Sequence, residues 1–285
     1  MSSLQRVIKY CAIAFAIMLC VGIISSIAGA GEMVVSFISG DRINTNDKDL
    51  IDFSDTFVGV QSLDIDNSTG TLSIKVGDTF KVEAEDVTSN FEAKVDNSGK
   101  LIISEKQKDL QFFFFNFNLG GINSPNSKIT VYLPADFIAE EAKIETGAGK
   151  VIIEGLNADQ LNISAGAGNI SGVNIISQEV KIDGGVGSVD FENVDFEDAD
   201  LNCGVGNINL QGILTGDNKI DCGVGEVKLD INGNAEDYEL DVDSGVGNIR
   251  VNGNKVSDDH KINSGAPNSI KIDGGVGDVS VDIAE

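Results

Sequence analysis

The amino-acid sequence predicts an all-β fold, a solenoid of 19-residue coils preceded by one N-terminal transmembrane helix. A triplet of glycine, a small apolar residue and glycine returns every 19 residues from Gly147 to Gly225. Apolar and polar residues alternate between the triplets, as they do in strands with one buried face. The 22 residues from Tyr10 to Gly31 carry no charged side chain. As a helix they would span about 33 Å, or one bilayer core.

The triplets are predicted to form corners between strands, because glycine reaches positive φ and lets backbones approach closely. After Gly225 the spacing changes to 22 residues, then to 20 at a degenerate Gly265-Ala266-Pro267, then to 10 at Gly275. The array is therefore expected to fray toward its C-terminal end. The predicted structural corner glycines are Gly147, Gly149, Gly166, Gly168, Gly185, Gly187, Gly204, Gly206, Gly223, Gly225, Gly245 and Gly247.

Two apolar columns keep step with the glycines and are predicted to point inward. One column contains Ile144, Ile163, Ile182, Leu201 and Ile220. The other contains Val151, Ile170, Val189, Ile208 and Val227. Nineteen extended residues trace about 60 Å, enough for one coil of a flattened solenoid with two or three short strands. A meander of equal hairpins would also repeat at 19, but it would not require small residues at every corner.

Directly before the first glycine of each triplet lies a column of small residues, namely Thr146, Ala165, Gly184, Cys203, Cys222 and Ser244. In a solenoid Cys203 and Cys222 would stack with Cα atoms about 4.8 Å apart, within the range that a disulfide allows. Small size alone also explains both residues. Free thiols and a disulfide therefore both stay open for this pair. Cys11 and Cys20 lie in the apolar stretch.

The N-terminal apolar stretch is predicted to be a signal anchor. Arg6 and Lys9 precede it and the next basic residue is Arg42. The positive-inside rule therefore places residues 1–9 in the cytoplasm, the helix at residues 10–31 and the rest of the chain outside, in a single-pass protein of the cell membrane. The alternative is a cleaved secretory signal, because Ala28 and Ala30 offer a cleavage site, but the apolar stretch is longer than the usual signal core.

Past the anchor, residues 32–55 are interpreted as a stalk and residues 56–285 as the β-solenoid. Alternating runs broken by Asn67-Ser68-Thr69-Gly70 and Asn97-Ser98-Gly99 are typical of strands and turns. Residues 56–143 are irregular and residues 144–285 follow the repeat. The expected organisation is a short cytoplasmic end, one span, a linker and one repeat domain.

A run of phenylalanines interrupts the irregular part. Because a strand alternates its faces, consecutive phenylalanines cannot all enter one core. Two interpretations follow: a segment folded over an open end of the stack, or an exposed patch that contacts a partner or the bilayer. The run comprises Phe112, Phe113, Phe114, Phe115 and Phe117.

The stretches "SLDIDNSTGTLSIKVG", "ITVYLPADF", "IETGAGKVIIEGL", "LNISAGAGNISG" and "IDGGVGSVDFEN" resemble the bacterial putative-adhesin family of β-strand repeats, a domain of unknown function. The resemblance covers residues 56–285. Together with the N-terminal anchor, the chain also resembles membrane-anchored proteins of Gram-positive envelope-stress operons. This resemblance implies a right-handed β-helix and an envelope location, and it supplies no catalytic residues.

The sequence favours a protein that is not an enzyme and predicts no cofactor and no metal site. Calcium-binding nonapeptide repeats require a period of 9, and here Val189 takes the ligand position that Asp190 misses by one residue. Phosphate-binding glycine loops need a following helix, which the strand pattern does not provide. Beyond the membrane segment the arginines are Arg42 and Arg250, far apart in sequence, and His260 is isolated. Adventitious calcium on the acidic surface stays open.

Charge is the clearest functional signal. Arg6 and Lys9 account for two of the 20 basic residues, so 18 basic and 45 acidic residues follow Gly31, a net charge of −27. Nucleic acid and anionic lipid would be repelled. One hypothesis is a non-catalytic, membrane-anchored, extracytoplasmic protein that presents an interaction surface to envelope proteins or wall components, as an adhesin or an envelope-stress scaffold. The alternative is a sensing module that binds a cationic peptide or a metal ion and signals through a membrane partner.

Overall fold

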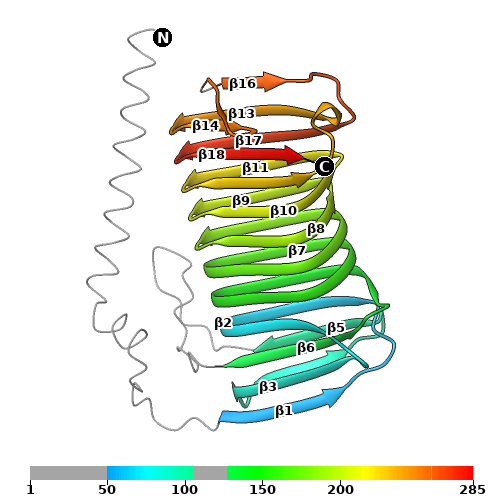
Figure 1. The fold of residues 1–285 in the computed structure, drawn as a ribbon. Helices are drawn as coiled ribbons and strands as arrows, with labels where there is room; N and C mark the ends of the chain where they lie inside the picture. Colours follow the sequence, from blue (N-terminus) through cyan, green and yellow to red (C-terminus); the bar gives the residue numbers. More distant parts are fainter. Residues whose placement is uncertain (1–49, 106–126, 258, 285) are drawn as a thin grey trace, which may run out of the picture. The chain divides into compact units, whose positions relative to one another are not determined.

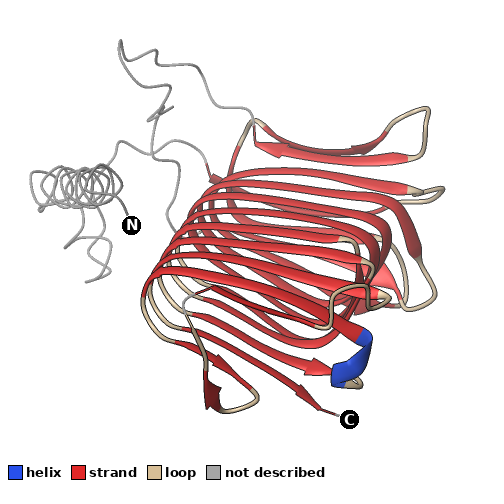
Figure 2. Cartoon of the chain, turned by 90° about the horizontal axis from the view of Figure 1, so that it is seen from above, coloured by secondary structure: helices blue, strands red, loops and turns tan. Residues whose placement is uncertain are grey.

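The computed structural model describes residues 50–105, 127–257 and 259–284. Within these residues the chain is all-β, with a single wrapped sheet and one short 3-10 turn, η1 (Ala235–Asp237). The predicted fold class is confirmed at this level. The strands stack as flattened coils of a solenoid (Figure 1), and from above each coil is seen as a curved loop around a common interior (Figure 2).

The strands have the following bounds in chain order: β1 (Leu50–Thr56), β2 (Ser62–Gly77), β3 (Lys81–Thr88), β4 (Phe91–Val95), β5 (Lys100–Glu105), β6 (Lys128–Pro134), β7 (Ile138–Val186), β8 (Val189–Glu197), β9 (Ala199–Val205), β10 (Ile208–Thr215), β11 (Asp217–Val224), β12 (Val227–Asn232), β13 (Tyr238–Val246), β14 (Ile249–Val251), β15 (Asn254–Lys255), β16 (Asp259–Ile262), β17 (Asn268–Val276) and β18 (Val279–Ala284). β7 continues through several corners without a break.

Parallel pairing at the repeat distance decides between the solenoid and the meander. In the middle array, defined as residues 138–232 (β7 to β12), Ile208 pairs in parallel with Val189 on one side and with Val227 on the other. Each of these partners is 19 residues away. Hairpins of a meander would pair antiparallel. The solenoid interpretation is therefore confirmed and the meander is wrong.

The two predicted apolar columns form the interior of this array. Every residue of both columns is at most 2% exposed, and so are Ile65 and Leu72, which continue the two columns into β2. Burial of each such side chain contributes about 1.5–3 kcal/mol. Side-chain sizes complement one another between coils, because Gly172 lies opposite Phe191 and leaves the space that the Phe191 ring fills.

At the N-terminal end of the stack, the first coil of the chain is not the outermost one. β2 pairs in parallel with β7 on one side and with β5 and β6 on the other. The coil made of β5 and β6 therefore lies outside β2. Antiparallel strands cover that outer coil, with β4 on β5, β3 on β6 and β1 on β3. β1 begins at Leu50, so strand structure starts earlier in the chain than the predicted Thr56.

The C-terminal end repeats this arrangement. β17 pairs in parallel with both β11 and β13, and β18 pairs with both β12 and β14. We call β17 and β18 the inserted C-terminal coil and β13 with β14 the outer C-terminal coil. β16 and β15 cover the outer coil with antiparallel pairing. The last coil of the chain thus fills a position between two coils that precede it (Figure 1).

The expectation that the array frays after Gly225 is therefore wrong. Gly275-Val276-Gly277 lies in register between the triplets at Gly223 and Gly245, so the corner column is unbroken. The irregular spacing arises because stacking order and chain order differ here. Gly265-Ala266-Pro267 is not a corner but part of the connection between β16 and β17, where the Gly265 N–H donates to Glu239 Oε2 at 2.7 Å.

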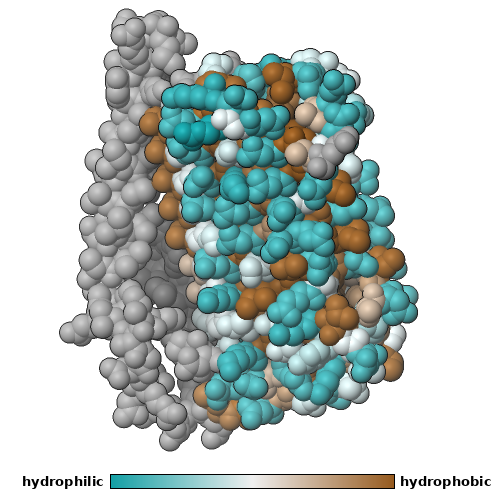
Figure 3. Space-filling view, viewed as in Figure 1, coloured by the Kyte–Doolittle hydropathy of each residue, from teal (hydrophilic) through white to brown (hydrophobic). Residues whose placement is uncertain are grey.

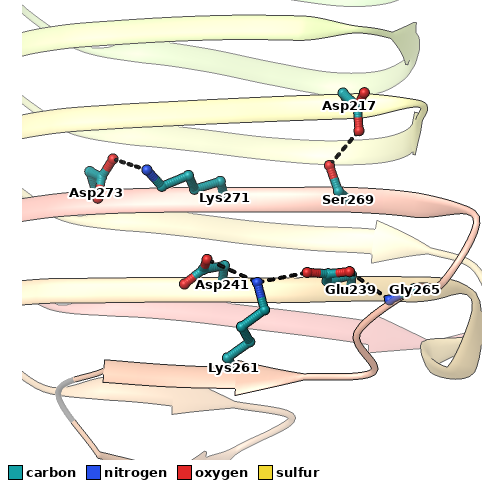
Figure 4. Close-up of polar contacts among 8 residues, drawn as sticks. All are labelled: Asp217, Glu239, Asp241, Lys261, Gly265, Ser269, Lys271 and Asp273. Atoms are coloured by element: carbon teal, nitrogen blue, oxygen red, sulfur yellow. Dashed lines mark hydrogen bonds and ion pairs between the residues drawn. The ribbon is translucent and has the colours of Figure 1, made fainter.

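Polar contacts fasten this end (Figure 4). Lys261 of β16 reaches Glu239 Oε1 at 2.7 Å and Asp241 Oδ2 at 3.3 Å on the outer coil. The Ser269 hydroxyl donates to Asp217 Oδ1 at 2.8 Å across the junction with the middle array. The ammonium of Lys261, followed by the Gly265 N–H, lowers the pKa of Glu239. Solvent screens these exposed contacts, so each adds little to the free energy of unfolding.

Several predicted features lie outside the described residues: the cytoplasmic end, the helix at residues 10–31, the stalk up to residue 49, and the phenylalanine run. The chain leaves β5 at Glu105 and enters β6 after Ser127. β5 and β6 pair with the two halves of β2. In the part of the chain that the structure describes, we find no helix of sufficient length and apolarity to span a bilayer.

Candidate interaction surface

The glycine corners are tightly stacked backbone. The Gly206 N–H donates to the Val224 carbonyl oxygen of the next coil at 2.8 Å, and the Gly187 N–H donates to the Val205 oxygen at 2.9 Å. A Cβ atom at Gly206 would overlap the Gly187 carbonyl oxygen, so no other residue fits without moving one coil away from the next. The hydrogen-bond ladder therefore continues through the corner, and this continuity requires glycine.

The two positions of a triplet require glycine for different physical reasons. The second glycine has φ near +145°, for instance +141° at Gly187 and +148° at Gly206, except in the outer C-terminal coil, where Gly247 does not lie in the left-handed region. The first glycine does not lie in the left-handed region, and a Cβ at Gly204 would instead come within 2.7 Å of the Gly185 oxygen. Of the two reasons expected for glycine at the corners, positive φ and close backbone approach, only close approach applies at the first glycine.

The middle residues of the triplets form an apolar stripe along the outside of the corners, which we call the corner ridge. Neighbouring valines are in direct register from Val186 to Val246. Val186 is 47% exposed, Val276 40% and Val246 46%. Val205 and Val224, which lie between Val186 and Val276, are half-buried. In stacking order the corner ridge consists of Ala148, Ala167, Val186, Val205, Val224, Val276 and Val246.

The interior side of the corner holds the predicted small-residue column. Cys203 and Cys222 are in direct register and buried, and both carry free thiols in this structure. The Cys203 thiol donates to the Gly187 oxygen at 3.5 Å and the Cys222 thiol donates to the Gly206 oxygen at 3.4 Å. A hydrogen bond with Cys203, together with burial, raises the pKa of Cys222. A disulfide between them stays a prediction.

The outer faces of the coils carry charge in ladders. Lysine and acidic residues two positions apart point to the same side of one strand and form exposed ion pairs. These pairs are Lys143–Glu145, Lys181–Asp183, Lys219–Asp221, Lys228–Asp230 and Lys271–Asp273. Teal, hydrophilic residues cover much of the face seen in Figure 3, with brown apolar residues between them. The outer surface is therefore polar but not uniformly so.

Acidic side chains crowd at two places beside the corners. Asp221, Asp273 and Asp243 occupy equivalent positions in three stacked coils and line an open depression of about 330 Å³ with the corner glycines. At the other end, burial, followed by the negative charge of Glu145, raises the pKa of Asp66. The corner ridge is thus bordered by carboxylates.

His260 is half-buried on β16 and pairs in the backbone ladder with Val242. Within the described ranges, no group of three or more histidine, cysteine, aspartate or glutamate side chains is arranged to hold a metal ion. Arg250 lies on β14 beside Asp278 at 3.7 Å, on a different strand from His260. The structure does not bring His260 and Arg250 together as a reactive group.

Sequence reasoning missed a second set of turn residues. Asn174 and Asn193 have φ of +58° and +52°, and Gly155 and Gly212 have φ of +90° and +155°. These four positions are 19 residues apart in sequence. The Asn193 side-chain amide donates to Asn174 Oδ1 at 2.5 Å. A column that holds only asparagine and glycine was a signal for positive φ, since these residues tolerate it best.

The fold and its corners define a class: an all-β solenoid whose short coils stack in parallel around a narrow apolar interior, with backbone-to-backbone glycine corners. The chain belongs to the Toastrack DUF4097 family, whose model matches residues 60–282. The family resemblance drawn from the repeated stretches is therefore confirmed. A comparison with curated proteins found no match.

Three solved structures are similar to this chain. A putative cell adhesion protein from Clostridium sporogenes is 17% identical, with 82% of this chain and 100% of that chain covered and a TM-score of 0.39. A putative adhesin from Bacteroides fragilis is 15% identical, with 82% and 97% covered and a TM-score of 0.42. A putative adhesin from Parabacteroides distasonis is 12% identical, with 84% and 98% covered and a TM-score of 0.41.

Proposed function

We propose that this protein is a non-catalytic, membrane-anchored, extracytoplasmic β-solenoid that presents an interaction surface, as an adhesin or a scaffold of the cell envelope. The observation that carries the proposal is the corner ridge. Five valines in register form an apolar stripe on a rigid backbone, and exposed apolar stripes of this kind are typical of contact sites. Envelope proteins or wall components are the proposed partners.

The proposed membrane anchor is supported by the sequence. Arg6 and Lys9 precede the uncharged residues 10–31, and the next basic residue is Arg42, a distribution that favours a cytoplasmic N-terminus. Protease added to intact protoplasts should digest the solenoid and leave the N-terminal fragment in the membrane. Full protection of the solenoid, or its release without protease, would contradict the proposed topology.

The ridge proposal is tested by removing its apolar side chains. Changing Val186, Val276 and Val246 together to serine should lower the recovery of crosslinked envelope partners at least tenfold, with little change in melting temperature, because these side chains face solvent. A matched control changes three other exposed apolar residues to serine, namely Val58, Ile138 and Ile176, which are 87%, 60% and 54% exposed. Equal partner loss in both variants, or none in the ridge variant, would reject the ridge as the contact surface.

A second candidate function is a sensing module for cationic peptides. The depression lined by Asp221, Asp273 and Asp243 borders the ridge, so a partner with basic and apolar side chains would find complementary groups side by side. Changing Asp243 and Asp273 to asparagine should weaken binding of a model cationic amphipathic peptide and flatten its dependence on salt. Unchanged affinity at low salt would remove this candidate.

A further inference from the structure

The chain contains two asparagine–glycine pairs in nearly identical local sequence. The first pair, Asn232-Gly233, lies in the tetrapeptide Ile-Asn-Gly-Asn at residues 231–234, and the second pair, Asn252-Gly253, lies in Val-Asn-Gly-Asn at residues 251–254. In such a pair the side-chain amide carbon is open to attack by the next backbone nitrogen, because glycine has no side chain that hinders the approach. The two pairs therefore differ mainly in the structure around them.

The first pair lies in a packed turn at the end of β12. The Gly233 N–H donates to the Ala284 carbonyl oxygen at 3.0 Å, so the nitrogen that would attack is already engaged. A Cβ atom at Gly233 would come within 2.9 Å of the Tyr238 ring, and Tyr238 is 3% exposed. Asn234, the next residue, caps η1. Attack on Asn232 therefore requires that this turn come apart.

The second pair forms the exposed two-residue turn between β14 and β15. Asn252 and Gly253 have φ of +48° and +74°, and positive φ at both positions is the type I′ geometry that favours asparagine followed by glycine. Nothing lies within 4 Å of a Cβ atom at Gly253. Among the described residues, the Gly253 N–H makes no hydrogen bond. The attacking nitrogen is therefore free and open to solvent at this turn.

The hairpin of β14 and β15 opens more easily than the rest of the solenoid. β15 consists of two exposed residues, and its ladder with β14 contains only two residue pairs. Exposed elements with few buried contacts open locally at a low cost in free energy. Opening frees rotation about the Cα–C bond of Asn252, and the attack requires this rotation. The second pair can therefore react while the middle array stays folded.

We propose that Asn252 is a site of spontaneous chemical modification, at which the side-chain amide is lost through a cyclic imide. The Gly253 nitrogen attacks Cγ of Asn252, a nitrogen–carbon bond forms, and the bond between Cγ and the amide nitrogen breaks. The Gly253 proton passes through solvent to the leaving group, which departs as ammonia. Water then opens the imide at one of its carbonyl carbons and gives aspartate or isoaspartate. Water is the only co-reactant, so no oxidant or cofactor is required.

Asn252 joins the β14–β15 hairpin to the last coil of the chain, so its modification has a structural consequence. Its Oδ1 atom accepts a hydrogen bond from the Ile283 N–H at 2.8 Å, and its own N–H donates to the Val281 oxygen at 2.9 Å. In isoaspartate the main chain runs through the former side-chain carbonyl, which lengthens the turn and removes this acceptor from Ile283. Modification therefore loosens the hairpin from the inserted C-terminal coil. The inference does not depend on the proposed interaction surface or membrane anchor.

The first experiment follows both pairs in the same full-length chain, kept in detergent in mildly alkaline buffer. Trypsin cleaves after Lys228, Arg250 and Lys255, so the two pairs fall on different peptides. The mass increase that accompanies loss of the amide should accumulate at Asn252 faster than at Asn232, by about tenfold or more. A parallel sample in urea should lose this difference, because the local sequences match. Equal rates in the folded chain would overturn the proposal, as would the same ratio of rates in urea.

The second experiment measures hydrogen exchange at the Ile283 amide. Exchange should be about tenfold faster or more in the isoaspartate form, separated chromatographically from the incubated wild type, than in the fresh chain. Asn252→Asp is the matched control, because it keeps a side-chain oxygen for the Ile283 N–H and has no amide to release as ammonia. The fresh variant should therefore exchange like the fresh wild type. Unchanged exchange in the isoaspartate form would mean that Asn252 does not join the hairpin to the last coil, and the structural part of the proposal would be wrong.

Discussion

The middle array and the two ends of the solenoid are built on different rules. In the middle array each coil contacts the coils that precede and follow it in sequence, so that Cys203 meets Cys222 after 19 residues. At each end the terminal coil of the chain lies one place inside the stack: β5 and β6 lie outside β2, and β13 and β14 lie outside β17 and β18. Chain order and stacking order agree only in the middle.

The arrangement at the ends protects the edge strands of the stack. A terminal coil placed outermost would hold to the stack through one side only and would present an unpaired edge. Here the first and last coils are hydrogen-bonded on both sides, and the outer coils carry antiparallel strands as covers. Repeat proteins generally need distinct capping units. In this chain the caps are made by rearranging repeats and adding short antiparallel strands.

The largest effect is expected from removing the inserted C-terminal coil. A chain that ends at Pro267 loses β17 and β18, whose five buried apolar side chains account for on the order of 10 kcal/mol of burial. That amount approaches the total stability of a domain. The outer C-terminal coil would lose the coil on which it stacks, and β11 would keep β9 but lose β17. Thermal unfolding and limited proteolysis should show a severely destabilised chain with cleavage within residues 233–267.

A chain that ends at Ile283 is the control, because it removes only the last two residues and keeps the whole interior of the coil. The insertion model predicts native-like melting for it. If the chain ending at Pro267 melts like the control, β13 and β14 stack directly on the middle array and the inserted coil is dispensable.

Glycine-to-alanine changes at the corners should destabilise the middle array more than the outer C-terminal coil. Gly206→Ala combines positive φ with overlap of the Gly187 oxygen and should cost about 3 kcal/mol or more. Gly247→Ala meets the Gly277 oxygen without left-handed φ and lies in the outer coil, which can shift, so it should cost less. Gly253→Ala has φ of +74° but open space around it and should cost about 1 kcal/mol.

Denaturant unfolding gives these three values. The order Gly206, Gly247, Gly253 is the expected result. Equal costs at Gly206 and Gly253 would mean that backbone angle, and not contact between coils, accounts for the glycine at the corner.

The middle array could be predicted from sequence because its interactions repeat at one distance. The columns of Ile182 and Val189 and the glycine period specify strand, corner and partner together. The ends could not be predicted in this way, since the same signals at Gly275 are compatible with stacking after Gly247 or before Gly245. The antiparallel strand β16 covers the outer side of β13 and leaves only the inner side for the last coil. This pairing is not encoded in any local sequence pattern.

The buried polar residues at the N-terminal end, Asn67 and Glu105 among them, could not be predicted for the same reason. Asn67 stands in a stretch typical of turns, and Glu105 is one acidic residue among 45. Asn67 and Glu105 lie in neighbouring coils because β5 pairs with the outer side of β2. The stacking order of these two strands is therefore the reverse of their order in the chain. The corner ridge, in contrast, was implied by the triplets themselves, although its exposure was not predicted.

Substitution of a cysteine of the stacked pair in the middle array should lower the free energy of unfolding only slightly. Cys222→Ala removes a buried thiol with a weak hydrogen bond and should cost about 1 kcal/mol at pH 7. The raised pKa of Cys222 keeps the thiol neutral in the folded state. Its stabilising contribution is thus present below the unfolded pKa of about 8.5 and is lost as the pH rises above it. The melting difference between wild type and variant should therefore shrink from pH 8 to pH 10.

Intact mass under non-reducing conditions is the check on this interpretation. A chain with a disulfide lacks two hydrogens and has no Cys222 thiol to titrate, so its melting difference would not change with pH in this range. Such a result would replace the free-thiol description of the pair.

The smallest expected effect is at Asp278, where the inserted coil meets the outer coil. The backbone N–H of Asn248, followed by its side-chain amide, lowers the pKa of Asp278, and Oδ1 lies 2.9 Å from that nitrogen. A lowered folded pKa stabilises the native state above the unfolded value of about 3.9, and the benefit disappears as the pH falls through the folded value. Asp278→Asn should therefore melt slightly below wild type at pH 7, with the two converging below pH 4. Glu140→Gln controls for the loss of one negative charge at an exposed position. Hydrogen exchange at the Asn248 amide should accelerate only in the Asp278 variant; equal exchange in all three chains would mean that this carboxylate does not fasten the outer coil.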